Sequence, residues 1–537
     1  MKDAVIIGAG LAGMCMLHRL REMGMTAQVY ETGSDVGGTW YWNRYPGARC
    51  DVESLDYQFA FSDELQRGWT WTERYAPQSE LLDYARYVAE SLDLRRDIQF
   101  ETRVESARFD ESDGLWRITT DSNDSITAKF CISAVGCLAA APRVPQFAGL
   151  DSFQGPWYHT GNWPKEQVDF SGQRVGLIGT GSSGIQCIPE IAAEAKQLLV
   201  FQRTPNFSVP AHNARLSPED VDKYKDTFLA LRREATQSDF GNSTWTSLPS
   251  ALAATPEERE AAYERSWEIG GAQFMVAFED MLTDAQANAT AADFVRRKIR
   301  SIVKDPEVAE KLSPTDHPLG AKRLCVDTNY YATFNRDNVQ LIDVRSAPIE
   351  AITATGLRTT DAEYEFDALV FATGFDAMTG PLTRIDIRGR DGLSLRDKWA
   401  AGPRTYLGLT VAGFPNFFTI TGPGSPSVLS NMALSIEQHV EWIGDCIAWL
   451  REQDQQTIEA KASAEDGWVD HVNEVANTTL FPQANSWYMG ANVPGKTRVF
   501  MPYVGGVGTY RRECDAIAAD GYAGFTVEPP QLQNQTN

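Results

Sequence analysis

The sequence predicts an α/β protein with two Rossmann-like dinucleotide-binding domains that are interleaved along the chain, one of them carrying a helical insertion. The order of strand, glycine-rich turn and helix occurs twice, with first glycines at Gly8 and Gly179. Residues 216–318 are rich in Glu, Ala, Arg and Lys, a composition that favours helices. Strands are expected again after this stretch, so segments of each domain return later in the chain.

The first unit begins at the N-terminus. The apolar residues 3–7 predict a strand, a helix is expected to about Met23, and a second strand at 27–30 ends at Glu31. The turn between strand and helix has three glycines in GxGxxG spacing: Gly8, Gly10 and Gly13. Such glycines permit a tight turn, close approach of a pyrophosphate and close packing of the helix on the strand. A carboxylate at Glu31 suits ribose hydroxyls and repels a 2′-phosphate, which indicates FAD or NAD.

The second unit repeats this order with a different final residue. Strand 175–178, a helix to about Ala195 and strand 198–202 are followed by Arg203 and Thr204. The turn consists of Gly179, Thr180, Gly181, Ser182, Ser183 and Gly184. A cation beside a hydroxyl suits the 2′-phosphate of NADP, so the sequence predicts FAD at the first unit and NADPH at the second. The alternative is that both turns are structural and bind no ligand.

Strands predicted at 339–344, 347–352 and 368–372, with no low-complexity linker, indicate domains whose segments alternate. The chain is therefore divided into an FAD-binding domain (1–140 and 376–525), an NADP-binding domain (141–215 and 319–375), a helical insertion in the latter (216–318) and a disordered tail rich in Pro, Gln and Asn (526–537).

The composition, with 43% hydrophobic and 23% charged residues, is that of an ordinary globular protein. A net charge of −23 argues against nucleic acid and anionic membranes as partners. There is no apolar stretch of about 18 residues and no signal peptide before the first strand, so we expect a cytoplasmic protein without a membrane span. The cysteines lack a CxxC pair and the histidines lack ligand spacing, which predicts free thiols and no metal. A monomer is compatible with these patterns, which leave the oligomeric state open.

Three further motifs lie outside the two units. Residues 37–51 read GGTWYWNRYPGARCD, in which the glycines allow backbone to approach a flavin ring and the aromatic residues exclude water. Residues 320–323 read GAKR, after a turn that contains Pro and Gly. Between the units lies the string Phe153-x-Gly155-x-x-x-His159-x-x-x-Trp163-Pro164. The alternatives are an aromatic loop packed as core and two basic residues that are mere surface charge.

Together these motifs resemble those of the type I Baeyer–Villiger monooxygenases, the group of phenylacetone, cyclohexanone and steroid monooxygenases. The resemblance runs from about residue 4 to 525. It implies an FAD- and NADPH-dependent monooxygenase that uses O2 to convert a ketone to an ester or lactone and retains NADP+ during the cycle. Which ketone is bound does not follow from the resemblance.

The resemblance also implies roles for individual residues. FAD contacts beyond the fingerprint are expected from Gly38, Thr39, Trp40, Asp51, Tyr57, Val104 and Met432. NADP contacts beyond the second fingerprint are expected from Arg49, Lys322, Arg323 and Trp487. Lys322 would join Arg203 and Thr204 at the 2′-phosphate, and Trp487 would lie on a mobile loop near residues 486–505 that folds over the nicotinamide.

Arg323 is the expected catalytic residue, with Asp51 as the residue that orients it. By the resemblance, O2 adds to the reduced flavin at C4a, and the deprotonated peroxyflavin attacks the ketone. An always-charged guanidinium stabilises that anion and the oxyanion formed on attack. Asp51, as a carboxylate, would tune the hydrogen bonds of Arg323 without acting as a nucleophile.

The string between the units is expected to connect the two domains. Its members Phe153, Gly155, His159, Trp163 and Pro164 would have a linker or conformational role. His159 invites assignment as a general base, but its position before the second unit favours coordination of domain movement. The chain turn Thr373-Gly374-Phe375-Asp376 is a second expected connection between the domains.

Two other functions stay open. A related flavin-containing monooxygenase oxygenating sulfur or nitrogen would share both fingerprints, but lacks the pairing of Asp51 with Arg323. A redox sensor or inert scaffold would use the cofactors only to change conformation, and the presence of Asp51 and Arg323 argues against it.

Overall fold

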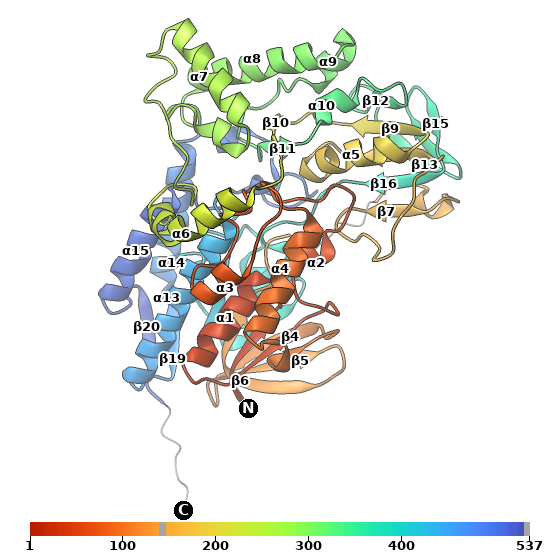
Figure 1. Cartoon of the computed structure of the whole chain (residues 1–537). Coiled ribbons are helices and arrows are strands. Elements are labelled where there is room, and N and C mark those ends of the chain that lie inside the picture. The colour runs from red at the N-terminus through yellow and green to blue at the C-terminus, as the bar shows by residue number, and fades with distance from the viewer. Residues whose placement is uncertain (139–145, 531–537) are drawn as a thin grey trace, which may run out of the picture.

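The structure is a computed structural model that describes residues 1–138 and 146–530 (Figure 1). One sheet has eight strands, of which seven follow the order β17 (Asp386–Arg388), β4 (Val104–Asp110), β5 (Leu115–Thr120), β6 (Ser125–Ser133), β1 (Lys2–Ile7), β2 (Ala27–Tyr30) and β3 (Ile98–Gln99). The eighth, β18 (Phe417–Thr419), pairs with β6. Strands β17 and β18 come from the last third of the chain, so the C-terminal segment completes a sheet that the N-terminal segment begins.

Helices cover this first sheet and fix the glycine turn after β1. The longer ones are α1 (Leu11–Glu22), α4 (Gln78–Ser91), α13 (Met432–Glu452), α14 (Ala462–Asn477) and α15 (Val507–Ala519). Helix α1 contacts both α4 and α13, and its buried face is largely apolar. The parallel pairing of β1 with β2 and β6 directs α1 to start at the carboxyl end of the sheet, where ligands bind in such folds.

A second sheet consists of five parallel strands. Their order is β12 (Val339–Asp343), β9 (Gln197–Gln202), β8 (Arg174–Ile178), β16 (Ala368–Phe371) and β7 (Trp157–His159). Helix α5 (Ser182–Glu194) follows β8, as α1 follows β1. Together the two sheets confirm the predicted α/β class with two interleaved dinucleotide-binding folds. The strand expected at 347–352 is β13 (Ile349–Thr353), which belongs to a small antiparallel sheet with β14 (Gly356–Thr359) and β15 (Glu363–Glu365).

The helical insertion contacts both domains. Its helices are α6 (Pro218–Ala235), α7 (Pro256–Ile269), α8 (Ala285–Ile302) and α9 (Pro306–Leu312), and residues 236–255 between the first two contain no helix. Figure 1 shows α7, α8 and α9 grouped together, with α6 apart from them and near α13 and α15. The short strands β10 (Ser208–Pro210) and β11 (Cys325–Asp327) pair where the insertion leaves and re-enters the domain. Shorter helices elsewhere are α2 (Thr39–Trp42), α3 (Asp63–Gly68), α10 (Tyr330–Thr333), α11 (Gly380–Thr383) and α12 (Leu395–Lys398).

The prediction of a disordered tail over residues 526–537 was wrong for residues 526–528, which belong to a strand. Strand β20 (Phe525–Glu528) pairs antiparallel with β19 (Thr457–Ala460), and Arg390 binds Glu528 at 2.8 Å. Backbone pairing with an existing strand outweighs the polar composition that suggested disorder. Residues 531–537 of the predicted tail, and the predicted domain boundary at 140, lie outside the described residues.

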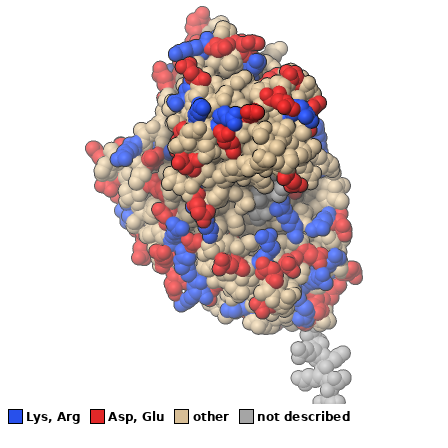
Figure 2. Space-filling view, turned by 90° about the vertical axis from the view of Figure 1, so that its right-hand side faces the viewer, with Lys and Arg blue, Asp and Glu red and all other residues tan. Residues whose placement is uncertain are grey.

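The surface and core fit the composition. The eight cysteines are buried and none forms a disulfide. Within residues 1–138 and 146–530, no helix has the length and apolarity to cross a membrane. On the face that Figure 2 shows, acidic and basic side chains are interspersed, so the negative net charge is not gathered there into one broad patch.

A nearly buried ion pair joins the insertion to the FAD-binding domain, in addition to the exposed pair of Arg67 with Asp226. The guanidinium of Arg232 on α6 lies 2.7 Å from the carboxylate of Glu437 on α13, and both side chains are nearly buried, at 7% and 11% exposure. Arg232 also donates to the backbone oxygens of Asp56 and Gln58, at 3.2 and 3.0 Å. A buried carboxylate that loses such a partner is left uncompensated.

We therefore expect Arg232→Ala to lower the free energy of unfolding by about 3–5 kcal/mol, because Glu437 then stays buried without a counter-charge. Urea unfolding followed by fluorescence measures this. Arg233→Ala, at the exposed next position, is the matched control and should change stability by less than about 0.5 kcal/mol. Equal effects of the two substitutions would contradict a special role of this pair.

Candidate functional site

A cavity of about 1160 Å³ lies where the two dinucleotide-binding folds meet, and residues of both glycine turns line it. Of the cofactor-binding residues that the sequence predicts, all line this cavity except Gly13, Gly184 and Lys322. The two glycines lie behind the turns that face the cavity. The shared lining brings both predicted cofactor sites into one space.

The first turn has no room for side chains. Gly8 has φ +104°, and a Cβ atom there would lie 2.6 Å from the Ala134 carbonyl oxygen. A Cβ on Gly13 would lie 1.9 Å from the Gly8 oxygen, and one on Gly38 2.9 Å from the Gly10 Cα. Backbone is therefore exposed to the cavity at the start of α1, the arrangement that suits a pyrophosphate at a helix N-terminus. These residues fit FAD.

Glu31 is oriented by the turn itself. Its carboxylate accepts hydrogen bonds from the backbone N–H of Ala9 at 2.8 Å and of Gly33 at 2.7 Å. Burial raises the pKa of Glu31, and these backbone donors oppose that rise. Each carboxylate oxygen has a second lone pair, which leaves acceptors for ribose hydroxyls.

The second turn repeats the geometry of the first. Gly179 has φ +115°, and a Cβ there would lie 2.4 Å from the Ala372 carbonyl oxygen. A Cβ on Gly184 would lie 2.2 Å from the Gly179 oxygen. Ala372 therefore lies against the turn after β8 in the same way that Ala134 lies against the turn after β1. The second turn fits a second dinucleotide.

Basic side chains gather at the end of β9. Arg203 is the residue directly after this strand, and Lys322 lies near it. The pKa of Lys322 is lowered, mainly by burial. Asp316 opposes this shift, and the neighbouring Arg203 and Arg345 add to it. The Arg345 Nε donates to the Arg203 carbonyl oxygen at 3.2 Å, and Arg345 pairs with Asp316 at 2.9 Å. Three cations around one carboxylate suit a phosphate group.

Arg345 was missed by the sequence reasoning. It follows β12, and β12 pairs with β9 in parallel, so the ends of both strands lie at the same edge of the sheet. The sequence did contain a signal for Arg345, because this basic residue directly follows the strand predicted at 339–344. The sequence did not indicate that this strand would lie next to β9.

Arg323 and Asp51 both line the cavity and bind each other. The Arg323 Nε donates to Asp51 Oδ2 at 2.6 Å and its Nη2 donates to Oδ1 at 2.7 Å, while Nη1 donates to the Val428 carbonyl oxygen at 2.7 Å. Both side chains face the cavity, with 29% and 22% of their surfaces accessible. The geometry is a bidentate pair between two chain segments, as the resemblance implied.

Each partner holds the other in its charged form. Burial alone would raise the pKa of Asp51, but Arg323 outweighs this and the pKa is lowered. Burial alone would lower the pKa of Arg323, but Asp51 raises it well above its usual value, with a further contribution from the Tyr488 hydroxyl. Tyr488 is a second residue that sequence reasoning missed, since only its neighbour Trp487 was singled out.

The flavin-side residues converge on the same cavity. Trp40 on α2 donates from Nε1 to the Tyr57 hydroxyl at 3.3 Å. The backbone N–H of Val428 lies 3.2 Å from the Met432 sulfur, which fixes the start of α13. Arg49 donates to Glu73 at 2.6 Å and lines the cavity between the two domains.

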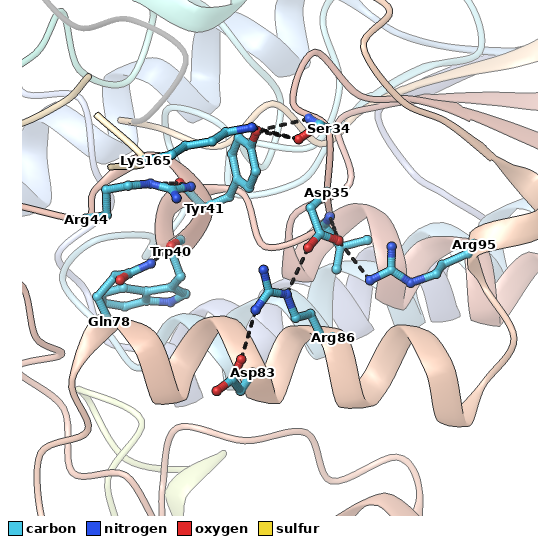
Figure 3. Close-up of polar contacts among 11 residues, drawn as sticks. Ser34, Asp35, Trp40, Tyr41, Arg44, Gln78, Asp83, Arg86, Arg95 and Lys165 are labelled. Atoms are coloured by element: carbon cyan, nitrogen blue, oxygen red, sulfur yellow. Dashed lines mark hydrogen bonds and ion pairs between the residues drawn. The ribbon is translucent and has the colours of Figure 1, made fainter. Parts of the chain in front are cut away.

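The loop that leads into α2, the short helix with Trp40, is held by charged contacts, shown in Figure 3. Asp35 binds Arg86 of α4 and Arg95, each at 2.8 Å. Lys165, the residue after the predicted linker string, donates to the Ser34 hydroxyl at 2.9 Å. The linker is therefore tied directly to the segment between Glu31 and the flavin-side residues.

The five named residues of the linker string do not line the cavity, although Gly161 and Asn162 of the same string do. His159 ends β7 and is buried; its Nδ1 accepts from the Gly161 N–H at 3.0 Å and its Nε2 lies 3.3 Å from the Thr373 hydroxyl. Burial lowers the pKa of His159 to about 4, so the ring is neutral at physiological pH. Both ring nitrogens have partners in the protein, an arrangement that leaves no free base directed at the cavity.

The other string residues pack around β7. The Phe153 ring lies 5.6 Å from that of Phe366, and a Cβ on Gly155 would lie 2.3 Å from the Asp367 oxygen. Trp163 packs 5.2 Å from the Tyr158 ring, and Pro164 follows it at a separate groove between the domains. The string thus forms the edge strand of the second sheet and the chain that leaves it.

The segment after α14 contributes to the wall of the cavity. Trp487 lines the cavity, while Asn492 donates to the Phe375 carbonyl oxygen and Lys496 binds Asp376, both at 2.7 Å. These contacts fasten the segment to the turn that follows β16.

Comparison with known proteins shows the same combination. The family description "flavin-binding monooxygenase-like" matches residues 1–221. A Baeyer–Villiger monooxygenase of Pseudooceanicola batsensis is 45% identical, over 97% of this chain and 95% of that relative. A phenazine N-monooxygenase of Lysobacter antibioticus is 43% identical, over 97% and 96%. The solved structure of an oxidized steroid monooxygenase bound to NADP is 50% identical with a TM-score of 0.94, over 98% and 99% of the two chains.

This likeness extends over nearly the whole chain, and the cavity fits two dinucleotides. The steroid monooxygenase structure is bound to NADP, and a structure of OTEMO, which is 41% identical with a TM-score of 0.94 over 98% of this chain and 99% of that one, is a complex with FAD and NADP. The chain therefore belongs to the flavin-dependent Baeyer–Villiger monooxygenases, with FAD and NADP as its cofactors.

Proposed function

We propose that the chain oxidises a neutral ketone to an ester or lactone with NADPH and O2, and that Arg323 is its catalytic residue. The observation that carries the proposal is the bidentate contact of Arg323 with Asp51, which faces the cavity shared by both fingerprints. When bound, FAD supplies the chemistry that takes electrons from NADPH and activates O2. The protein has to orient the ketone and stabilise the charge that develops on it.

Arg323 suits that task because a guanidinium stays charged at any physiological pH. Negative charge grows on the carbonyl oxygen of the ketone as oxygen is transferred, and a fixed cation in a site with little water stabilises it. The Arg323 Nη1 is held by Val428, so the plane of the guanidinium is set before the ketone binds. Preorganised charge of this kind commonly lowers the activation free energy by a few kcal/mol.

Asp51 acts through orientation in this proposal. Its lowered pKa keeps the carboxylate ionised, so it accepts two hydrogen bonds from Arg323 and has no proton to give. A carboxylate on the flavin-binding segment thereby determines where a cation of the NADP-binding segment lies.

The lining near Arg323 favours an uncharged substrate. Side chains on this part of the cavity wall are Cys137, Leu138, Val428, Met432 and Trp487. They are apolar or weakly polar, and the charge of Arg323 is already balanced by Asp51. A substrate carboxylate would lose its water without gaining a free cation.

The cation cluster at β9 suits the 2′-phosphate of NADPH. Arg203 and Lys322 are the expected ligands, and we add Arg345 because it donates to the Arg203 carbonyl oxygen. Asp316 neutralises one of the three cations, and a phosphate dianion balances the other two.

Oxygenation of sulfur or nitrogen is the second candidate, favoured by the likeness to the phenazine N-monooxygenase. A sulfur or nitrogen nucleophile attacks the activated oxygen directly, so no negative charge develops on a carbonyl oxygen. Such an activity would therefore not depend on Arg323 in the way that ketone oxidation does.

Arg323→Ala should reduce ester formation from a ketone panel by about 10²-fold or more, because the developing oxyanion loses its fixed cation. NADPH-dependent flavin reduction should persist, and stopped-flow absorbance separates it from product analysis. The exposed Arg297→Ala on α8 is the control and should keep wild-type product yield. Undiminished ester from the Arg323 variant would refute the role.

The same Arg323→Ala protein, given a thioether in place of the ketone, distinguishes the second candidate. Sulfoxide formed at the wild-type rate while ester is lost would assign Arg323 to carbonyl chemistry alone. Loss of both activities would show that Arg323 serves a step common to all substrates.

Lys322→Ala and Arg345→Ala should each raise the KM for NADPH about tenfold or more and leave the KM for NADH within about twofold, because only NADPH carries the 2′-phosphate. Steady-state kinetics with both cofactors measures this. A rise of the same size for NADH would remove the phosphate assignment.

A further inference from the structure

Arg323 is held at its backbone as well as at its guanidinium. The Asn206 Nδ2 donates to the Arg323 carbonyl oxygen at 3.2 Å, and the Cys325 thiol donates to the same oxygen at 3.6 Å. Arg323 precedes β11, and within residues 1–138 and 146–530 no backbone N–H donates to this oxygen. Asn206 and Cys325 therefore form a side-chain support for this part of the backbone.

The two members of the side-chain support also bind each other. The Asn206 Nδ2 lies 3.1 Å from the Cys325 sulfur, so the two hydrogens of the amide serve the carbonyl oxygen and the sulfur. Burial raises the pKa of Cys325 to about 11, so the thiol keeps its proton and donates it to the Arg323 oxygen. Each hydrogen of the pair therefore has one acceptor.

Two contacts tie the side-chain support to the second glycine-rich turn. The Ser182 hydroxyl lies 3.4 Å from the Cys325 sulfur. The Thr180 hydroxyl donates to the Thr204 carbonyl oxygen at 3.1 Å, and Thr204 lies two positions before Asn206. Both Thr180 and Ser182 line the cavity. The support is therefore joined to the turn that fits the second dinucleotide.

The two ends of Arg323 are held from opposite sides of the cavity. Asp51 and Val428 bind the guanidinium but not the backbone from which it extends. Asn206 and Cys325 bind that backbone and do not themselves line the cavity. A catalytic group has to stay close to its productive geometry, and hydrogen bonds from residues behind it supply that precision.

We propose that Asn206, together with Cys325, is a positioning residue for Arg323 that fixes its backbone to the NADP-binding turn. This inference rests on the proposed function of Arg323. Without the amide, the contact with Asp51 persists but the backbone behind the guanidinium is free to shift. The guanidinium then stabilises the charge on the ketone less well, and more of the activated oxygen is released as hydrogen peroxide.

The test is Asn206→Leu in the full-length enzyme loaded with FAD, because leucine has a similar volume and donates no hydrogen bond. Ester formation in a single turnover should slow about tenfold, and hydrogen peroxide released per NADPH should rise correspondingly. The KM for NADPH should stay within about twofold of wild type, because Arg203 and Lys322 are unchanged. A rise in that KM as large as the loss of ester would show a general disturbance of the turn and overturn the proposal.

Asn338→Leu is the matched control. Asn338 is also half-buried, and its Nδ2 donates to the carbonyl oxygens of Ala192 and Ala195, both at 2.9 Å. These oxygens lie at the end of α5 that is far from Ser182, so the variant loses two comparable hydrogen bonds away from the cavity. It should keep the wild-type ratio of ester to NADPH. An equal loss in this control, or a wild-type ratio in Asn206→Leu, would contradict the proposal.

Two further variants remove the side-chain support in other ways, and they decide the question if Asn206→Leu fails to bind FAD. Asn206→Ala loses the amide without adding apolar surface and should show the same split between ester formation and KM. Cys325→Ala should lower the ester formed per NADPH about threefold, because a thiol forms weaker hydrogen bonds than an amide. A wild-type ratio of ester to NADPH in both variants would refute the positioning role.

A double-substitution cycle tests whether Asn206 acts through Arg323. In an Arg323→Ala background no guanidinium is left to position, so Asn206→Leu should change the accumulated ester by less than about twofold. Independent, multiplying effects would overturn the proposal. If Arg323→Ala itself forms ester normally, the proposed function of Arg323 fails and this inference with it. If only the substitutions at Asn206 and Cys325 are silent, the function of Arg323 stands.

Discussion

A guanidinium and a carboxylate that are 272 positions apart in the chain meet in the cavity between two domains. Asp51 comes from the first segment of the FAD-binding domain, Arg323 from the returning segment of the NADP-binding domain, and Val428 from the last third of the chain. Separating the pair would leave two partly buried charges without a counter-charge, which is unfavourable. The packing of the domains and the formation of the contact that we propose to be catalytic are therefore the same event.

The two glycine-rich turns have the same backbone geometry, although they are expected to bind different dinucleotides. Both turns place a glycine with positive φ against an alanine carbonyl of the neighbouring strand, and both bring the helix within contact of the first glycine. The difference lies in the residue after the second strand. Glu31 is fixed by backbone donors of its own turn, whereas Arg203 stands among other cations. Backbone geometry thus shapes both turns for a pyrophosphate, and we propose that the side chains at the end of the second strand set which nucleotide is preferred.

Local patterns explain what could be predicted from the sequence. The strand at 27–30 is β2 with the same bounds, and the strand at 198–202 differs from β9 by one residue, because apolar runs and glycine turns are read within a few residues. Arg345 was missed because its contact with Arg203 joins positions that are 142 residues apart. The start of the predicted tail failed for a similar reason: β20 forms only because β19 offers it a free edge. The roles of Arg323 and Asp51 came from a resemblance, since adjacent Lys322 and Arg323 alone are indistinguishable from surface charge.

The position of His159 gives a physical reason why a string whose named residues do not line the cavity is linked to the residues that do. Its ring faces the Thr373 hydroxyl and lies edge-on to Phe375, and the oxygen of Phe375 accepts from Asn492. Asn492 belongs to the segment that carries Trp487, and both residues line the cavity. A neutral imidazole is suited to such a contact, because a charged ring at this buried point would need a counter-charge that the surrounding side chains do not supply. The string is then constrained by its contact with the turn after β16, and that turn in turn binds the segment that carries Trp487.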